Sequence, residues 1–189
     1  MAGDGPGLPG GLGARVDALM DGLRKDPERL AAIPSIAFPG CPPGPVEAAH
    51  DLVASLLLAA GAPTVERIDL PGTAPAVWAE VPPPDPSAPT VLLYAHYDVQ
   101  PPGGPDRAEG GLGHRGLVHR HRRLDPAGQR AGHGGSRAEV LLFGAQDGMC
   151  NLHAPNERVL LSELRNTVVA PAAFVREYAA DFRAAGAPR

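Results

Sequence analysis

The sequence predicts an α/β fold, and three observations lead to this prediction. Apolar residues recur at helical spacing in the first third of the chain, then at every second position, and a continuously apolar run, TVLLYA at 90–95, follows. Apolar residues form 43% of the 189 residues, which suffices for a core. Aromatic residues form only 4%, so we expect a core built from Leu, Val and Ala.

The first expected element is a helix that follows a Gly- and Pro-rich leader, residues 1–13, which we expect to be disordered. Four apolar residues at i, i+3, i+4 and i+7 mark its buried face: Val16, Leu19, Met20 and Leu23. They predict a helix over 14–25. Five prolines between residues 33 and 45 exclude a helix or a central strand there, so this segment is predicted to be a loop.

A second amphipathic helix is predicted from Val46 to Ala60, with Gly61 placed to close it as a C-cap. From Thr64 onward the apolar period changes to two, which predicts two short strands on either side of the Pro71-Gly72 turn. The apolar positions of these strands are Val65, Ile68 and Leu70, and then Val77, Ala79 and Val81.

The run Thr90–Ala95 is apolar at every position after the first, which is typical of a strand covered on both faces. We therefore expect it to be the central strand of the fold. Two helices before a buried strand favour a layered α/β domain.

The next segment, residues 105–137, departs from this pattern. It contains 8 Gly, 7 Arg and 4 His but only four large apolar residues, so we expect a disordered Gly/Arg/His tract. Residues 140–144 (VLLFG) are predicted to form a second buried strand, and 162–183 show helical spacing. An interior proline costs about 3 kcal/mol or more, so Pro171 is expected to break this last helix near Ala170 or to divide it into two helices, the second with Pro171 in its first turn.

Composition limits the classes of partner. The net charge of −4 gives no global attraction to nucleic acid or to an anionic membrane surface, and neither is expected as a partner. The longest apolar stretch, Leu52 to Ala62, is too short to span a bilayer. Two cysteines, Cys41 and Cys150, are too few for a disulfide framework, so we expect a cytoplasmic protein.

His96 and Asp98 are the first candidates for chemistry, because they follow the predicted central strand at its carboxyl end. In an extended segment, residues i and i+2 point to the same side, so the imidazole and the carboxylate are predicted to lie together. A neutral imidazole is a good zinc ligand, and a carboxylate beside it holds its orientation. The alternative is a histidine whose hydrogen bonds are satisfied at the end of a strand.

Three segments of the chain together resemble the dinuclear zinc exopeptidases of metallopeptidase family twenty, which include enzymes of the carnosinase, aminoacylase and glutamate-carboxypeptidase type. The dipeptidase branch looks nearest. The likeness covers 14–104 and 138–184. The segments that carry it are IPSI at 33–36, VLLYAHYDVQPPG at 91–103 and NLHAPNERV at 151–159.

The resemblance implies a three-layer α/β/α catalytic domain and a site with two zinc ions. It implies that His96 is a metal ligand, that Asp98 supports the catalytic site, and that His153 is a ligand of the second metal. The implied reaction is metal-dependent hydrolysis of the amide bond of a small peptide or an N-acyl amino acid.

The residues that this reaction needs are missing from the middle of the sequence. In the family, a bridging Asp, an adjacent Glu-Glu pair and a further acidic ligand lie between the two matching blocks, together with a lid or dimerisation domain. Here that interval is only 105–137, and no Glu-Glu pair occurs anywhere in the chain. The resemblance therefore implies an N-terminal part of a catalytic domain at 14–104, a C-terminal part at 138–189, no lid domain and no hydrolysis. At most one zinc ion is expected, and weakly bound.

A non-enzymatic interpretation stands beside this one. A deletion combined with a frameshift in GC-rich DNA accounts for both the lost middle and the composition of the tract. The product would be partly disordered, and its Arg and His residues would bind metal or a polyanion only incidentally. It would also melt with low cooperativity, since strands that normally flank the central strand are absent.

Overall fold

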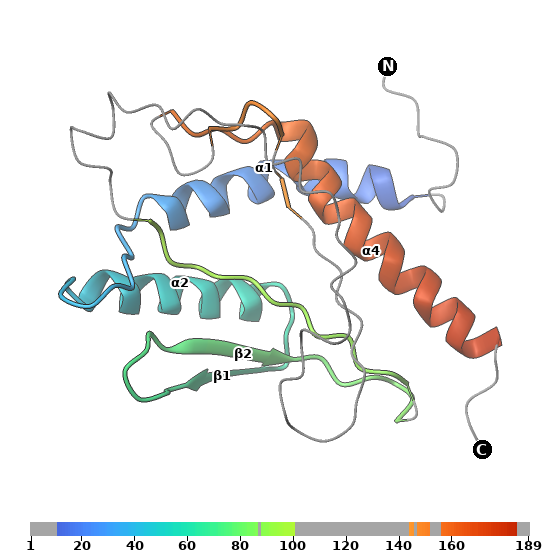
Figure 1. The fold of residues 1–189 in the computed structure, drawn as a ribbon. Helices are drawn as coiled ribbons and strands as arrows, with labels where there is room; N and C mark the ends of the chain where they lie inside the picture. Colours follow the sequence, from blue (N-terminus) through green and yellow to red (C-terminus); the bar gives the residue numbers. More distant parts are fainter. Residues whose placement is uncertain (1–10, 87, 101–143, 146, 152–155, 185–189) are drawn as a thin grey trace, which may run out of the picture.

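The structure is a computed structural model that describes residues 11–86, 88–100, 144–145, 147–151 and 156–184. Three helices and two strands form in these residues (Figure 1). They are, in chain order, α1 (Leu12–Ala31), α2 (Gly44–Ala59), β1 (Thr64–Ile68), β2 (Ala76–Glu80) and α4 (Leu161–Ala184).

Helix α1 is longer than its apolar pattern predicts at both ends. It includes Leu12 and Gly13, which were assigned to the leader, and it continues past residue 25 to Ala31 with Pro27 inside it. A proline within a helix removes one hydrogen bond, and here the turns on either side remain helical. Of the predicted buried face only Val16 is buried, while Met20 and Leu23 are partly exposed and Leu19 is 55% exposed. The rest of the predicted leader, 1–10, lies outside the described residues.

Helix α2 begins at Gly44, before its predicted start at Val46, because Pro45 lies in the first turn, where a proline costs no hydrogen bond. The helix ends as the sequence predicts. Gly61 takes a φ of +95°, a left-handed conformation that glycine adopts without steric cost. The Gly61 amide donates to the Leu58 carbonyl at 3.0 Å, and the Ala62 amide donates to the Leu57 carbonyl at 3.1 Å. This pair of bonds is the Schellman motif, which satisfies carbonyls that the end of the helix leaves open.

The two strands predicted around the Pro71-Gly72 turn are confirmed. β1 and β2 form an antiparallel sheet in which Glu66 faces Trp78. Gly72 has a φ of +74° in the connection between them. The Arg67 guanidinium of β1 donates to the Glu47 carboxylate of α2, with Nη2 and Oε1 3.0 Å apart, and so links the sheet to the helix.

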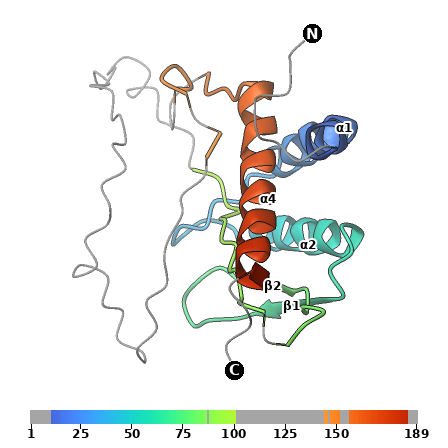
Figure 2. The same ribbon diagram turned by 90° about the vertical axis from the view of Figure 1, so that its right-hand side faces the viewer.

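The sheet, α2 and α1 lie one above another, and α4 runs crosswise beside them, in contact with α1 (Figure 2). Helix α2 contacts both strands and α1, and α1 contacts α4. The buried apolar side chains of the described residues are Val16, Val46, Ala49, Cys150 and Val169. The general α/β class is therefore correct, with a two-stranded antiparallel sheet.

The prediction of a central strand at Thr90–Ala95 is wrong. The segment is not a strand, and Leu92, Leu93 and Tyr94 are 71%, 75% and 88% exposed. A buried strand needs a neighbouring strand on at least one edge, and in the described part of the chain β1 and β2 pair only with each other. Residues 140–143 of the second predicted strand and the whole tract, 105–137, lie outside the described residues.

The predicted break at Pro171 is also wrong, because α4 runs without interruption through that residue. The proline removes the amide that would bond to the Thr167 carbonyl, and the helix continues without that bond. Packing compensates along the same helix, since Val169 is buried and Arg165 bonds to Asp17 of α1, with Nη2 and Oδ2 3.3 Å apart. Within the described residues, no helix is long and apolar enough to cross a membrane.

Candidate functional site

Tyr97 fixes the backbone between His96 and Asp98. Its hydroxyl donates to the carbonyl of Pro75, in the connection between the strands, and its ring meets the His50 ring of α2 edge-on, with centroids 6.5 Å apart. Partial burial raises the pKa of the Tyr97 hydroxyl, and the negative charge of Glu47 raises it further. The hydroxyl therefore stays protonated and keeps its role as a donor at neutral pH.

Ser35 holds the same stretch from the other side. Its hydroxyl donates to the Tyr97 carbonyl at 3.3 Å, and its own carbonyl accepts from the Val99 amide at 3.1 Å. Ser35 is fully buried, so both bonds are shielded from water. The IPSI segment, 33–36, and the HYD segment, 96–98, therefore lie in contact although they are separated by about sixty residues of chain.

The His96 and Asp98 side chains lie on one side of the backbone, as the i, i+2 spacing predicts. His96 Nδ1 is 3.2 Å from Asp98 Oδ1 and 3.3 Å from the Asp98 carbonyl oxygen. A carboxylate and a carbonyl only accept hydrogen bonds, so this contact places the imidazole proton on Nδ1. The lone pair of Nε2 is then free to bind a cation.

The pair opens onto a shallow hollow of about 140 Å³. Part of its wall comes from the C-terminal end of α1, through Pro27, Leu30 and Ala31, and the rest from residues 96–99. The His96 side chain is 70% exposed and that of Asp98 is 30% exposed. A ligand therefore reaches the imidazole directly from solvent, while the carboxylate is partly shielded.

The motif that contains His153 is described only at its two ends. The Arg158 amide donates to the Cys150 carbonyl at 2.9 Å and closes the loop between them. Inside this loop, Asn151 and Asn156 have φ values of +54° and +61°, the left-handed conformation that asparagine tolerates better than most residues. His153 itself lies outside the described residues.

Metal-ligating side chains do not form a larger cluster in the described part of the chain, where no group of three or more His, Cys, Asp and Glu residues lies close enough to hold an ion. Within the described residues the site therefore consists of the His96 imidazole with the Asp98 carboxylate as its support. Zinc is usually bound by three or four protein ligands, so this pair alone makes a weak site.

The chain matches no protein-family model, no curated protein and no solved structure. The chemistry of the site therefore has to be argued from the geometry of its own residues.

Three residues that support the site were not predicted from the sequence as part of it: Ser35, His50 and Tyr97. His50 lies four residues after Val46 and so belongs to the buried face of α2. Helical periodicity could therefore have predicted its burial. His50 is buried, its Nδ1 is 3.1 Å from Asp51 Oδ1, and its Nε2 has no hydrogen-bond partner within the described residues. The contact of Ser35 with Tyr97 has no local signal, because it joins distant parts of the chain.

Proposed function

We propose that this chain is a remnant of the three-layer catalytic domain of a dinuclear zinc exopeptidase, and that it keeps one weak zinc site but not the hydrolytic activity. The observation that carries the proposal is the hydrogen bond between His96 Nδ1 and Asp98 Oδ1 at 3.2 Å. The bond leaves Nε2 available as a ligand and gives the carboxylate its supporting role.

Two further observations support the proposal. The IPSI and HYD segments, which contribute to the same family resemblance, lie in contact through Ser35 and Tyr97. The described ends of the NLHAPNERV segment are brought together by the hydrogen bond from the Arg158 amide to the carbonyl of Cys150, the residue before the segment. Each of these local arrangements is compatible with segments inherited from one ancestral site.

The residues present fit a single zinc ion better than two. His96 supplies one neutral nitrogen ligand, His153 would supply a second, and water molecules would complete the coordination. The ion would act as a Lewis acid toward a carbonyl group, but hydrolysis also needs a base to take a proton from water. The chain has no Glu-Glu pair to supply this base.

A titration of the chain with zinc, measured by calorimetry, tests the proposal. We expect weak binding of one ion per chain, and we expect His96→Gln and His153→Gln each to weaken it at least tenfold. Asp98→Ala removes only the supporting carboxylate and should weaken binding by about 10- to 100-fold. The matched control is the double variant His119→Gln and His121→Gln in the tract, which should leave this binding unchanged.

The competing function is incidental binding by the Arg/His tract, and the composition of 105–137 is the observation that favours it. It predicts the reverse result: the double tract variant loses zinc binding, and His96→Gln does not. It also predicts zinc-independent association with single-stranded nucleic acid. The affinity of this association should fall steeply as salt concentration rises.

A direct assay separates the remnant from a working enzyme. We expect no hydrolysis of dipeptides or N-acyl amino acids above the rate of buffer that contains the same concentration of Zn²⁺ or Co²⁺. Turnover that is lost in His96→Gln would contradict the proposal that the catalytic machinery is missing.

A further inference from the structure

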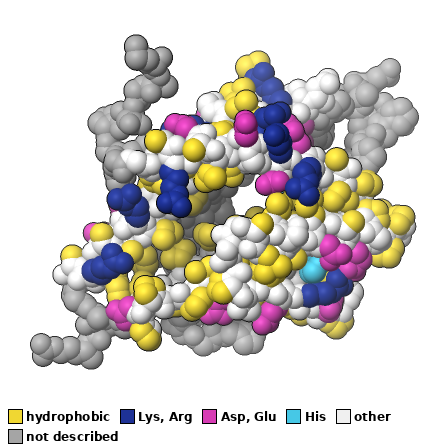
Figure 3. All heavy atoms as spheres, turned by 180° about the vertical axis from the view of Figure 1, so that it is seen from behind, with side chains coloured by type: hydrophobic (Ala, Val, Ile, Leu, Met, Phe, Trp, Pro, Cys, Tyr) yellow, Lys and Arg dark blue, Asp and Glu magenta, His cyan; other side chains and the backbone are white. Residues whose placement is uncertain are grey.

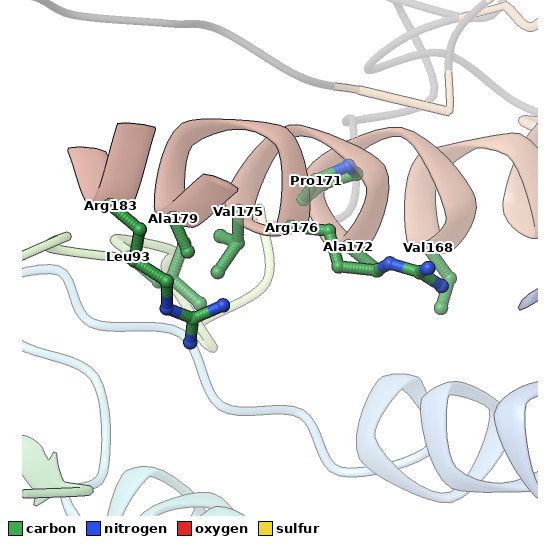
Figure 4. Close-up of a pocket in the computed structure, with 8 residues that line it drawn as sticks. All are labelled: Leu93, Val168, Pro171, Ala172, Val175, Arg176, Ala179 and Arg183. Atoms are coloured by element: carbon green, nitrogen blue, oxygen red, sulfur yellow. The ribbon is translucent and has the colours of Figure 1, made fainter. Parts of the chain in front are cut away.

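A groove runs along the second half of α4, where side chains one helical turn apart lie in a row (Figure 4). It has a volume of about 580 Å³. Its apolar lining consists of Leu93, Val168, Pro171, Ala172, Val175 and Ala179. Five of these six residues belong to α4 and recur at a spacing of three or four, so they form one continuous apolar strip.

The charge of the groove distinguishes it from the rest of the exposed apolar surface. Exposed apolar side chains occur over much of the molecule (Figure 3), so exposure alone does not mark a binding site. The groove is also lined by Arg176 and Arg183, which are both exposed. The neighbouring acidic residues of α4, Glu177 and Asp181, do not line it. Within the described residues, its charged lining is therefore entirely positive.

The two arginines are available to a ligand. In the described part of the chain, neither forms a hydrogen bond or an ion pair, whereas Arg165 of the same helix bonds to Asp17. Arg176 and Arg183 are seven residues apart, so they lie on the same face of α4 with about 10.5 Å between them along the helix axis. Both side chains are long, so their guanidinium groups can turn toward one carboxylate that lies between them.

We propose that this groove binds a long-chain fatty acid. The hydrocarbon chain lies along the apolar strip of α4, and the carboxylate accepts hydrogen bonds from Arg176 and Arg183. Each methylene group that the groove removes from water strengthens binding by up to about fourfold. The arginines select an anionic head group over an uncharged one, because a hydrogen bond between two charged groups is stronger than one between neutral groups.

The size of the groove favours a single hydrocarbon chain over a helix of a partner protein. A helix with its side chains is about 10–12 Å across and rises about 5.4 Å per turn, so one turn occupies roughly 500 Å³. The groove, with its volume of about 580 Å³, holds little more than one such turn. Small-molecule sites have volumes of about 300–1,000 Å³, a range that includes this groove.

Equilibrium dialysis with radiolabelled dodecanoate, below the concentration at which it forms micelles, tests the proposal. A metal chelator is present throughout, because a bound zinc ion would also attract a carboxylate. The result is then independent of the proposed zinc site. We expect one dodecanoate per chain and an affinity that falls by up to about fourfold for each methylene removed, down to octanoate. The methyl ester of dodecanoate should compete about tenfold less well than the acid.

Variants of the groove locate the binding. The double variant Arg176→Gln and Arg183→Gln should raise the dissociation constant about tenfold. Val175→Glu should raise it by a similar factor, because it places a negative charge beside the carboxylate; Val175 is 40% exposed, and glutamate is a good helix former. Circular dichroism checks that α4 persists in both variants.

The matched control is the double variant Arg15→Gln and Arg24→Gln, which removes the same charge from exposed positions of α1 outside the groove. It should leave the dissociation constant within about twofold of that of the unchanged protein. The proposal is overturned if dodecanoate does not bind, if the affinity does not depend on chain length, or if the groove variants bind as well as the control. An affinity independent of chain length would instead indicate attraction of the carboxylate by charge alone.

Discussion

Glu47 and Arg67 show how single residues connect elements in this molecule. Their ion pair joins α2 to β1, and Arg67 also bonds Asp69, with Nε and Oδ1 2.9 Å apart. The pair holds the pKa of Glu47 below its ordinary value, first through the hydrogen bond from Arg67 and then through the attraction of its charge. Both side chains are partly exposed, so water and salt screen the contribution.

The lowered pKa of Glu47 predicts how stability depends on pH. Because the folded state favours the ionised carboxylate, the contribution is present above the ordinary carboxyl pKa, 4.5, and is lost as pH falls through the lowered value. We expect Glu47→Gln to flatten the fall in unfolding free energy below about pH 4.5. Urea unfolding at a series of pH values measures this slope.

Glu66→Gln is the matched control for this experiment, since Glu66 is an exposed carboxylate on the same strand as Arg67. It should leave the slope nearly unchanged. An equal effect of the two variants would show that general charge, and not the link between α2 and β1, determines the acid sensitivity.

The His96 and Asp98 contact is the part of the site that sequence reasoning describes correctly, because it depends on the alternation of neighbouring side chains. The hydrogen bonds that join Tyr97 to Ser35 and to Pro75 could not be predicted in this way. It depends on how three separate stretches of chain meet, and no short pattern contains that information.

At the scale of the element, glycines in different conformations predict opposite effects on stability. Gly61 closes α2 with a φ of +95°, so Gly61→Ala should destabilise the protein by roughly 1–2 kcal/mol. Gly22 lies inside α1, and nothing lies within 4 Å of an added Cβ there. Gly22→Ala should therefore stabilise the protein by roughly 0.5–1 kcal/mol.

Urea or thermal unfolding of the two variants beside the unchanged protein measures both signs. If Gly22→Ala destabilises the protein instead, residue 22 is not helical in solution or the added methyl group meets a neighbour there. If Gly61→Ala has no effect, the end of α2 is not held in the left-handed conformation in solution.

Thr90–Ala95 and α4 show why composition alone misleads at this scale. The first has the composition of a buried strand but lacks a neighbour to pair with among the described residues. The second contains a proline that was expected to end it, yet contacts with α1 keep the helix continuous. In both cases the outcome depends on what lies next to the element rather than on its own residues.

At the scale of the whole molecule, little apolar surface is shielded from water. In the part of the chain that the structure describes, buried apolar side chains are few and mostly small, while large ones such as Leu92 and Tyr94 are exposed. Among the described elements, α4 contacts only α1, and the sheet contacts only α2. A structure of this kind lacks the shared core that makes unfolding cooperative.

We therefore expect a broad thermal transition. Scanning calorimetry should give an unfolding enthalpy well below the roughly 0.7 kcal/mol per residue of globular proteins, and circular dichroism and tryptophan fluorescence should not follow one curve. Scans at two protein concentrations serve as a control, because they detect any contribution of association. A sharp transition with coincident probes at both concentrations would contradict this prediction.

The sequence by itself determined the features that depend on residues close together in the chain. The second helix with its glycine cap, the hairpin around Pro71-Gly72 and the common side of His96 and Asp98 are all of this kind. Their energies come from backbone conformation and from contacts a few residues apart, which apolar period and turn residues describe directly.

Only the tertiary structure decided the features that need a distant partner. It left Thr90–Ala95 exposed, kept α4 continuous through Pro171, and joined Ser35 to Tyr97. Strand pairing, helix packing and buried hydrogen bonds each require two parts of the chain to meet. Whether they meet depends on the competition among all the surfaces of the molecule, which no single segment of sequence specifies.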